Sequence, residues 1–449
     1  MEKNKILIWL VFICLCSCEN EDFKKAKSFT FRTSTKVDSI SIDDYPKGIP
    51  IYKSMFYDSI KSYVDNGKLR ESLSYHHLLK IGKYTEVKQA NELELDWGLN
   101  QVDNKELKKI DDYELVDAQE FILDKSKDHE IIIISEAHTK PEHRVFTRCL
   151  LNGLYTNGYR HLGLENILAL SRDKSGKMMD SLMNIRGYPT ITALSGIYTS
   201  EPEYSNLIRE AIDIGFTIFS YERNGSSDSE RDKQQAERII NYMSNIPDGD
   251  KVICHAGWYH AIEGSIKKSE ESENYWLAHE YKRLSGIDPL TIYQDALNYK
   301  IATNQKSSPY YDYLQDRIKG YVKPLVLIDE NNKPWPGPGD SLPFDIVTVQ
   351  PRINYDYNDN SLPWDSWNCS SCESKKVEID LFNLNSEISS DEIYLFEVRR
   401  AYESELATPL YGKEISINNP ILNLNLCIGS YKVKFIDRDG NEYKALISL

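Results

Sequence analysis

The sequence lacks an excess of positive charge. Among its 449 residues, 69 Asp and Glu outnumber 54 Lys and Arg, which gives a formal net charge of −15. A protein that binds nucleic acid needs a basic surface to neutralise phosphates, so this balance argues against a nucleic-acid partner. It does not restrict the choice of small molecule. Hydrophobic residues make up 41% of the chain, which is ordinary for a globular protein and argues against wholesale disorder.

The N-terminal apolar run is too short for a comfortable membrane span, but it has the pattern of a targeting signal. Lys3 and Lys5 precede the apolar segment from Ile6 to Cys16. The segment ends in Leu15-Cys16-Ser17-Cys18, which resembles a bacterial lipobox. This resemblance predicts cleavage after residue 17 and attachment of lipid at Cys18, with palmitate as one of the acyl groups. The alternative is a plain secretory signal with incidental cysteines.

An acidic cluster, Glu19-Asn20-Glu21-Asp22, follows the predicted lipid attachment site. It is similar to the surface-export signal of lipoproteins in some Gram-negative phyla. We therefore expect a lipid-anchored protein of the outer membrane, with the cell surface as one possible face.

A second Cys-x-x-Cys pair is also lacking. The cysteines beyond the signal are Cys149, Cys254, Cys369, Cys372 and Cys427. Cys369 and Cys372 flank two serines and could form a small disulfide, which is permitted outside the cytoplasm. A structural zinc site would need another such pair.

The apolar pattern changes character along the chain. After the signal the sequence is polar, then apolar residues recur at helical spacing, and from Glu130 strand-like and helix-like segments alternate. Beyond Val377 the pattern is that of short strands, with a hairpin turn at Asp437-Arg438-Asp439-Gly440. The predicted order is signal peptide (1–17), tether (18–50), helical segment (51–120), α/β core (121–352), linker (353–374) and β-sandwich (375–449).

The fold class that follows is α/β, with a mainly parallel sheet, flanking helices, a helical N-terminal segment and a C-terminal all-β sandwich. Its first central strand is expected at Ile131–Ser135, where four isoleucines indicate burial on both faces. The other predicted core strands are 161–165, 216–221, 251–255, 290–293, 324–328 and 345–349, and the predicted helices are 141–157, 203–214, 229–244 and 275–284.

Acids or histidines stand at the ends of four successive predicted strands. They are Glu136 and His138, then Glu165, then Tyr221 and Glu222, then His255 with His260 beyond it. The carboxyl ends of parallel strands meet at one edge, where ligands collect in open α/β sheets. Such a set can hold a divalent cation with water in an open position, or act directly as acid–base pairs.

Several stretches carry a family resemblance over residues 115–350. Ser135-Glu136-Ala137-His138, Pro141-Glu142-His143-Arg144 and Gly158-Tyr159-Arg160-His161-Leu162-Gly163-Leu164-Glu165 resemble the G-E-x-H … G-[YF]-R-…-E pattern of one superfamily. It contains the erythromycin esterases, the ChaN haem-binding lipoproteins and the TIKI/TraB-type metalloproteases. Arg231-Asp232-Lys233-Gln234-Gln235-Ala236 is similar to the esterases' R-[ED]-x-x-M-A helix start, and Val252 to His260 resembles the family strand that ends in a histidine.

The chain departs from the pattern in three places. Ser135 replaces the usual glycine, Gln235 stands where methionine is common, and His255 and His260 are five residues apart instead of closer. The resemblance implies site roles for Glu136, His138, Glu165 and His260, and less directly for Arg231, His255 and Glu222.

The branches of the superfamily imply different activities. The esterases imply hydrolysis of a macrolactone ester with a histidine that activates water. The TIKI type implies a metal site that cleaves peptides, and the ChaN type implies haem binding without catalysis, with a histidine or tyrosine as axial ligand. A degenerate enzyme that recruits a partner is a third alternative, which Ser135 motivates.

Each candidate residue also has a plainer interpretation. Glu136 could cap the next helix, His138 could lie in a solvated loop, and His143 is expected to be structural. The remaining alternatives are a salt bridge from Glu165 to Arg160 or Arg186, a helix-surface position for His260, pairing of Arg231 with Glu237, and no role for His76 or His77.

The leading prediction is a metal-assisted hydrolase acting on an ester or amide in a small-molecule or peptide substrate. Arg231 would stabilise the negative charge that develops in the reaction. His255 is also predicted to be a catalytic residue, without a specific role. The predicted ligands of a manganese, zinc or cobalt ion are Glu136, His138, Glu165 and His260. Haem or another small ligand, held without turnover, is the alternative.

Overall fold

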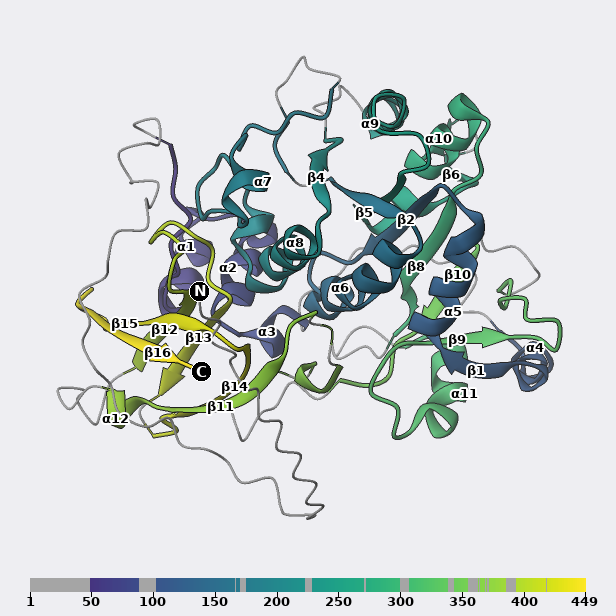
Figure 1. The fold of residues 1–449 in the computed structure, drawn as a ribbon. Helices are drawn as coiled ribbons and strands as arrows, with labels where there is room; N and C mark the ends of the chain where they lie inside the picture. Colours follow the sequence, from purple (N-terminus) through teal and green to yellow (C-terminus); the bar gives the residue numbers. More distant parts are fainter. Residues whose placement is uncertain are drawn as a thin grey trace, which may run out of the picture.

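A central sheet of eight strands organises the part of the chain that the structure describes (Figure 1). The structure is a computed structural model, and it describes residues 49–88, 102–165, 167–169, 175–222, 228–269, 272–298, 307–337, 343–353, 362, 364–367, 369, 371–384, 393–416 and 418–449. The predicted signal peptide, the lipidation site Cys18 and nearly all of the predicted tether lie outside these residues.

The sheet runs in the order β1-β9-β10-β8-β2-β5-β3-β4. Its strands are β1 (Glu114–Asp117), β2 (Ile131–Glu136), β3 (Tyr159–Leu164), β4 (Thr217–Ser220), β5 (Lys251–Gly257), β8 (Leu290–Leu297), β9 (Leu325–Ile328) and β10 (Ile346–Val349). The run from β10 to β4 is parallel throughout, while β9 pairs with β10 and β1 with β9 in antiparallel fashion. The predicted fold class is thus confirmed.

Strand β2 is buried on both faces, as its four isoleucines predict. Because side chains alternate along a strand, Ile132 and Ile134 join one apolar core and Ile131 and Ile133 join the other. All four side chains are fully excluded from solvent. The first core is covered by α5 (Ala118–Lys125), α6 (Pro141–Thr156) and α8 (Pro202–Ile214), and the second by α9 (Asp228–Met243), α10 (Leu277–Ser285) and α11 (Pro309–Ile318).

The helix boundaries follow ordinary start and stop signals. Helices α6 and α8 both begin with a proline, whose missing N–H is not needed in the first turn. Helix α8 ends at Gly215, which takes a φ of 116° that a side chain would oppose. Short helices α4 (Asn104–Lys108) and α7 (Met183–Arg186) and the hairpin β6 (Ser265–Ser269)–β7 (Ser272–Tyr275) complete the core.

Two antiparallel sheets form the C-terminal part and share one apolar core. Their orders are β11-β14 and β13-β12-β15-β16. Their elements are β11 (Ser374–Asp380), α12 (Leu381–Leu384), β12 (Ile393–Arg400), β13 (Tyr411–Ser416), β14 (Ile421–Cys427), β15 (Ser430–Ile436) and β16 (Glu442–Ser448). The predicted turn joins β15 to β16, with the Gly440 N–H donating to the Asp437 carbonyl at 3.1 Å.

The N-terminal helices pack between this C-terminal part and the core (Figure 1). They are α1 (Tyr57–Asp65), α2 (Glu71–Lys80) and α3 (Tyr84–Lys88). Their apolar residues belong to the same core as those of α6 and α8. Glu414 of β13 accepts from the Tyr57 N–H at 2.7 Å and pairs with Lys83 at 3.1 Å. The helical segment therefore buries its apolar face against both neighbours, as its small size requires.

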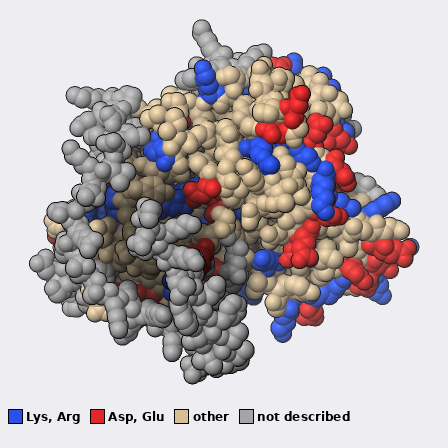
Figure 2. All heavy atoms as spheres, in the orientation of Figure 1, with Lys and Arg blue, Asp and Glu red and all other residues tan. Residues whose placement is uncertain are grey.

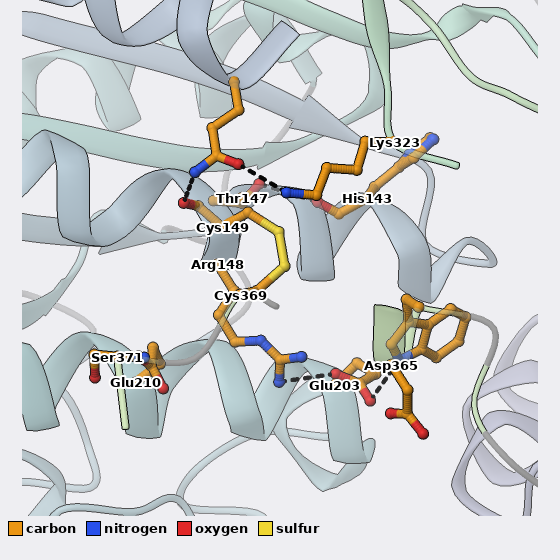
Figure 3. The surroundings of a disulfide bond; sticks show 12 residues. His143, Thr147, Arg148, Cys149, Glu203, Glu210, Lys323, Asp365, Cys369 and Ser371 are labelled. Atoms are coloured by element: carbon orange, nitrogen blue, oxygen red, sulfur yellow. Dashed lines mark hydrogen bonds and ion pairs between the residues drawn. A yellow bond between two sulfur atoms is a disulfide. The ribbon is translucent and has the colours of Figure 1, made fainter. Parts of the chain in front are cut away.

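The cysteine pairing differs from the expected Cys369–Cys372 loop. Cys149 on α6 is bonded to Cys369 (Figure 3). Cys372 is bonded to Cys427 at the end of β14. Cys369 and Cys372, three residues apart, thus bond to different parts of the protein: Cys369 to helix α6 of the α/β core and Cys372 to strand β14 of the C-terminal part. Cys254 is the free cysteine among the described residues, and it is buried in β5.

Acidic and basic side chains are interspersed over the face shown in Figure 2. Among the helices of the described residues, none combines the length and apolar character that a membrane crossing needs.

Candidate active site

The strand ends that carry the predicted site residues are adjacent in the sheet. Strands β2, β5, β3 and β4 follow one another in that order and are all parallel. Their carboxyl ends therefore meet at one edge, as predicted. The predicted residues gather there in two hydrogen-bonded groups, which we call the Glu136 cluster and the Glu165 cluster.

The Glu136 cluster consists of Glu136, His138, Arg144, His255 and Glu201. The Glu136 carboxylate accepts from Arg144 Nε at 2.6 Å and Nη2 at 3.2 Å, and His255 Nε2 lies 3.1 Å from its Oε2. His138 Nδ1 lies 2.9 Å from Glu136 Oε1. Arg144 also donates to Glu201 at 2.9 Å and to the His138 carbonyl at 2.8 Å. The guanidinium thus fixes both the acid and the backbone of the histidine that follows it.

Burial and charge act against each other on Glu136. Its side chain and that of Arg144 are fully excluded from solvent. Burial alone would raise the pKa of Glu136, but Arg144 and His255 outweigh burial and hold this pKa well below its usual value. Glu136 is therefore a carboxylate at any working pH, and it does not simply cap a helix.

The Glu165 cluster consists of Glu165, Arg231, His260, Glu222 and Asp232. Glu165 accepts from Arg231 Nη2 at 2.6 Å, and its Oε1 lies 3.1 Å from His260 Nε2. Arg231 also donates to Glu222 through Nε at 3.0 Å and Nη2 at 2.8 Å. Asp232 pairs with the other ring nitrogen of His260. Helix α9 supplies Arg231 and Asp232, which pair with the acids and the histidine at the strand ends.

His260 is held in its protonated form. Burial alone would lower its pKa, but Asp232 and Glu165 raise the pKa to about 10. Burial likewise opposes the charge of Glu165, yet His260 and Arg231 hold the pKa of Glu165 well below its usual value. The cluster is thus a set of paired charges. Glu165 pairs with Arg231 instead of the alternatives Arg160 and Arg186, which donate to backbone carbonyls and Asp180.

The two clusters meet at Gly257, the last residue of β5. A Cβ placed there would lie 2.6 Å from His138 Cε1, 2.9 Å from His138 Nε2 and 3.0 Å from Glu165 Oε2. The Gly257 N–H also donates to Glu165 Oε2. The glycine is therefore required by close approach, because its φ of −75° and ψ of 141° suit any residue.

Aromatic rings enclose His138. Its ring centroid lies 4.8 Å from that of Trp258 and 4.8 Å from that of Tyr198. Tyr198 begins the 3₁₀ helix η4 (Tyr198–Ser200), and Trp258 begins η5 (Trp258–Ala261) with a φ of 30°. Such a backbone conformation in a bulky residue costs energy and is concentrated at functional sites. Contact with both rings restricts the rotation of the imidazole.

His255 and His143 have supporting positions. His255 is buried, with Nδ1 at 3.1 Å from Thr147 Oγ1 and its carbonyl accepting from the Tyr221 hydroxyl at 2.8 Å. The ring nitrogen Nδ1 of His143 accepts from the Ala137 N–H at 3.0 Å, which braces the segment between Glu136 and His138.

Several site residues carried no usable signal in the sequence. Arg144 and Asp232 both lie inside stretches that resemble the superfamily, but neither stretch assigns them a role. Tyr198 is one of 30 tyrosines. His76 on α2, for which no role was expected, packs its ring 4.2 Å from that of Tyr198. A local pattern cannot identify such residues, because only the fold brings them to the site.

The four predicted metal ligands divide between the two clusters, so they do not form one group. Each carboxylate oxygen of Glu136 and Glu165 already accepts a hydrogen bond, and both nitrogens of His260 face carboxylates. Among the four side chains, Nε2 of His138 is the ring nitrogen to which no described residue bonds. In this arrangement the donors do not form a zinc-type site, which takes three or more protein ligands. Within the described part of the chain, no three His, Cys, Asp or Glu side chains are arranged to hold a metal ion. Metal binding stays a prediction.

A cavity of about 300 Å³ lies elsewhere, between α6, α8 and the C-terminal sheets. It is lined by Arg148, Glu203, Trp364 and Asp365 among others, and none of the predicted site residues lines it. Figure 3 shows this region beside the Cys149–Cys369 disulfide, with Arg148 paired to Glu203 at 3.1 Å.

Comparison with known proteins gives little beyond the geometry. No family model and no curated protein matches the chain. Solved structures that it resembles include one described as bacterial protein toxins (TM-score 0.29, 17% identity, 50% of this chain and 43% of that one). Others are the RRSP effector domain of a MARTX toxin from Vibrio vulnificus CMCP6 (TM-score 0.27, 17% identity, 40% and 36%) and the type III effector HopBA1 (TM-score 0.28, 13% identity, 52% and 92%). The chain spans less than half of the first of these structures. The superfamily resemblance stays a prediction.

Proposed function

We propose that this protein is a hydrolase of ester or amide bonds in which His138 is the general base. The observation that carries the proposal is the pairing of His138 Nδ1 with the Glu136 carboxylate at 2.9 Å. A carboxylate at Nδ1 places the ring proton there and leaves the lone pair on Nε2. That atom lies beside Gly257 and Glu165, at the edge of the sheet where a substrate would bind.

The Glu136 cluster is suited to this task. Arg144 keeps Glu136 ionised, and the ionised acid stabilises the imidazolium that forms when Nε2 takes a proton from water. Tyr198 and Trp258 both pack against the ring of His138. In the pair of His138 and Glu136, the histidine is the more exposed, with 16% of its side chain accessible against 0% for Glu136. The base therefore reaches water while its supporting acid does not.

The Glu165 cluster contains two cationic side chains, Arg231 and His260, whose shared partner Glu165 approaches Gly257 from the same side as His138. The neighbouring acids hold His260 protonated, and Arg231 lies beside it, with Nη1 at 3.3 Å from His260 Nε2. Three carboxylates, Glu165, Glu222 and Asp232, face these two cations, so the charged groups are already paired without substrate. Arg231 Nη1, which is directed at no described carboxylate, is the donor that would stabilise the negative charge developing on the carbonyl oxygen during attack by water.

Export and lipid anchoring at Cys18 are part of the proposal. The disulfides Cys149–Cys369 and Cys372–Cys427 support an oxidising compartment, because such bonds rarely persist in the cytoplasm. Metal-assisted hydrolysis and haem binding remain the alternatives. A metal ion held by the four predicted ligands, or haem bound through His260, would require a cluster to open, since the acids and His260 are already paired.

The test is hydrolysis of p-nitrophenyl esters of different acyl length, and of a casein peptide mixture, by the intact chain. We expect His138→Ala to lower the rate by about 10²- to 10⁴-fold, and Glu136→Gln to lower it in the same direction. His129→Ala is the matched control, because His129 precedes the other end of β2 and the hydrogen bond of its ring is to the Asp288 carbonyl, at 3.4 Å, away from the site.

Two further measurements separate the alternatives. Activity that survives EDTA and dialysis supports direct base catalysis, whereas activity that is lost and then restored by manganese or zinc supports a metal. Haem added to the protein would give a Soret shift that His260→Ala abolishes if the binding alternative is correct. Equal rates for the wild type and His138→Ala would overturn the proposed function.

A further inference from the structure

The N-terminal helical segment reaches the candidate site through one side chain. His76 on α2 packs its ring edge against Tyr198, with centroids 4.2 Å apart and the planes at 68°. Tyr198 in turn packs against His138 with centroids 4.8 Å apart. Three rings from three separate elements thus form a continuous row that ends at the proposed base. His76 is only 4% exposed.

Nδ1 of His76 is buried, and no described residue is its hydrogen-bond partner. Leaving a buried polar atom without a partner is energetically unfavourable. Burial, and then the charge of Arg144, lower the pKa of His76 well below its usual value, so the ring is neutral. The neighbouring His77 also has a buried Nδ1 without a described partner, so what distinguishes His76 is its ring contact with Tyr198.

The Tyr198 hydroxyl is subject to the charges of both Glu165 and Glu136 but is hydrogen-bonded to neither. Burial, followed by the charges of Glu165 and Glu136, raises the pKa of Tyr198, so the phenol keeps its proton. No described residue is assigned a hydrogen bond with this hydroxyl. The cationic donors are different, because Arg231 Nε and Nη2 and both nitrogens of His260 are already directed at carboxylates. Near His138, the phenol is thus a neutral donor that is available to a ligand.

We infer that Tyr198 donates a hydrogen bond to the oxyanion of the reacting ester or amide, and that His76 is a positioning residue that holds the phenol for this task. The inference rests on the proposed hydrolase function. His138 Nε2 takes a proton from water, and the oxygen of that water bonds to the carbonyl carbon. The carbonyl π pair moves onto oxygen, which the Tyr198 O–H stabilises while it keeps its proton. Collapse re-forms the carbonyl, breaks the bond to the leaving group, and transfers the proton from His138 to that group.

The experiment is steady-state hydrolysis of p-nitrophenyl acetate and butyrate by the full chain and four variants. Tyr198→Phe keeps the ring contacts and removes only the hydroxyl. We expect kcat to fall about 100-fold, with KM and the pH dependence little changed. His76→Ala should also lower kcat, and the double variant should lose no more than Tyr198→Phe alone, because His76 acts through the hydroxyl.

His77→Ala is the matched control. His77 is the next residue on α2 and is also buried, with 8% of its surface exposed against 4% for His76, and its Nδ1 likewise has no described partner. Its pKa, however, responds to burial and Lys80 and not to the site. We expect its kcat to equal that of the wild type. Wild-type kcat for Tyr198→Phe, or losses that add in the double variant, would overturn the inference while the hydrolase stands. An absence of turnover that depends on His138 would instead overturn the proposed function, and the inference with it.

Discussion

Replacing Gly257 by alanine should disable the site with little effect on the backbone. Gly257 has a φ of −75° and a ψ of 141°, which alanine adopts freely. The new Cβ, however, would lie 2.6 Å from His138 Cε1 and 3.0 Å from Glu165 Oε2. Carbon atoms in contact are normally about 3.5–4.0 Å apart, so the imidazole must move by about 1 Å.

A displacement of this size is large enough to affect both the catalytic rate and the free energy of unfolding. Misplacing a catalytic group by about 1 Å can cost about 10²-fold in rate, and overpacking costs about 1–3 kcal/mol in the free energy of unfolding. Ester hydrolysis gives the first quantity and urea denaturation the second. We expect kcat to fall about 100-fold and the free energy of unfolding to fall by no more than about 3 kcal/mol.

Gly429→Ala is the control for this substitution. A Cβ at Gly429 meets nothing closer than 3.8 Å, at the Tyr431 hydroxyl, far from the strand ends. It should therefore change neither kcat nor stability beyond about 0.5 kcal/mol. If Gly257→Ala keeps wild-type kcat and stability, His138 does not depend on the space beside Gly257, and the proposed position of the base is wrong.

Three further predictions concern stability. Burial and then Lys80 lower the pKa of His77 from 6.5 to about 4. As the pH falls, the unfolded chain therefore binds this proton first, so the free energy of unfolding should be full above pH 6.5 and fall by about 3 kcal/mol towards pH 4. Urea denaturation should show a weaker pH dependence of this free energy for His77→Leu, and an unchanged pH dependence would contradict the assignment. Arg209→Ala leaves the buried Glu403 without its partner at 2.8 Å and should cost about 3–5 kcal/mol in the same assay, whereas a loss below about 1 kcal/mol would show that the carboxylate is hydrated or protonated instead. Replacing Cys149 and Cys369 together by serine opens a link across 220 residues and should cost about 2–4 kcal/mol, with unchanged mobility on non-reducing electrophoresis counting against the bond.

Much of the core could be predicted from local patterns. The run Ile131–Ile134 predicted a strand buried on both faces, because alternate side chains of a strand face opposite sides, and β2 has this arrangement. Pro141 and Gly215 predicted a helix start and a helix end, since one residue lacks an N–H and the other accepts a positive φ. These features depend on near neighbours, which the chain itself specifies.

Other features depended on contacts that no local pattern encodes. The Cys369–Cys372 loop was the wrong pairing, because the partners that the fold brings near are Cys149 and Cys427. The strand order was also beyond reach, since β5 enters between β2 and β3 although it follows both in the chain.

By itself, the sequence determined which chemical groups stand at the strand ends. Glu136, His138 and Glu165 follow directly from where each apolar run stops. Only the tertiary structure decided how they are paired. Arg144 neutralises Glu136, Arg231 and His260 neutralise Glu165, and His76 arrives from a helix that precedes the sheet. The physical reason is that charge pairing and burial depend on distance in space, and distance in space is set by packing.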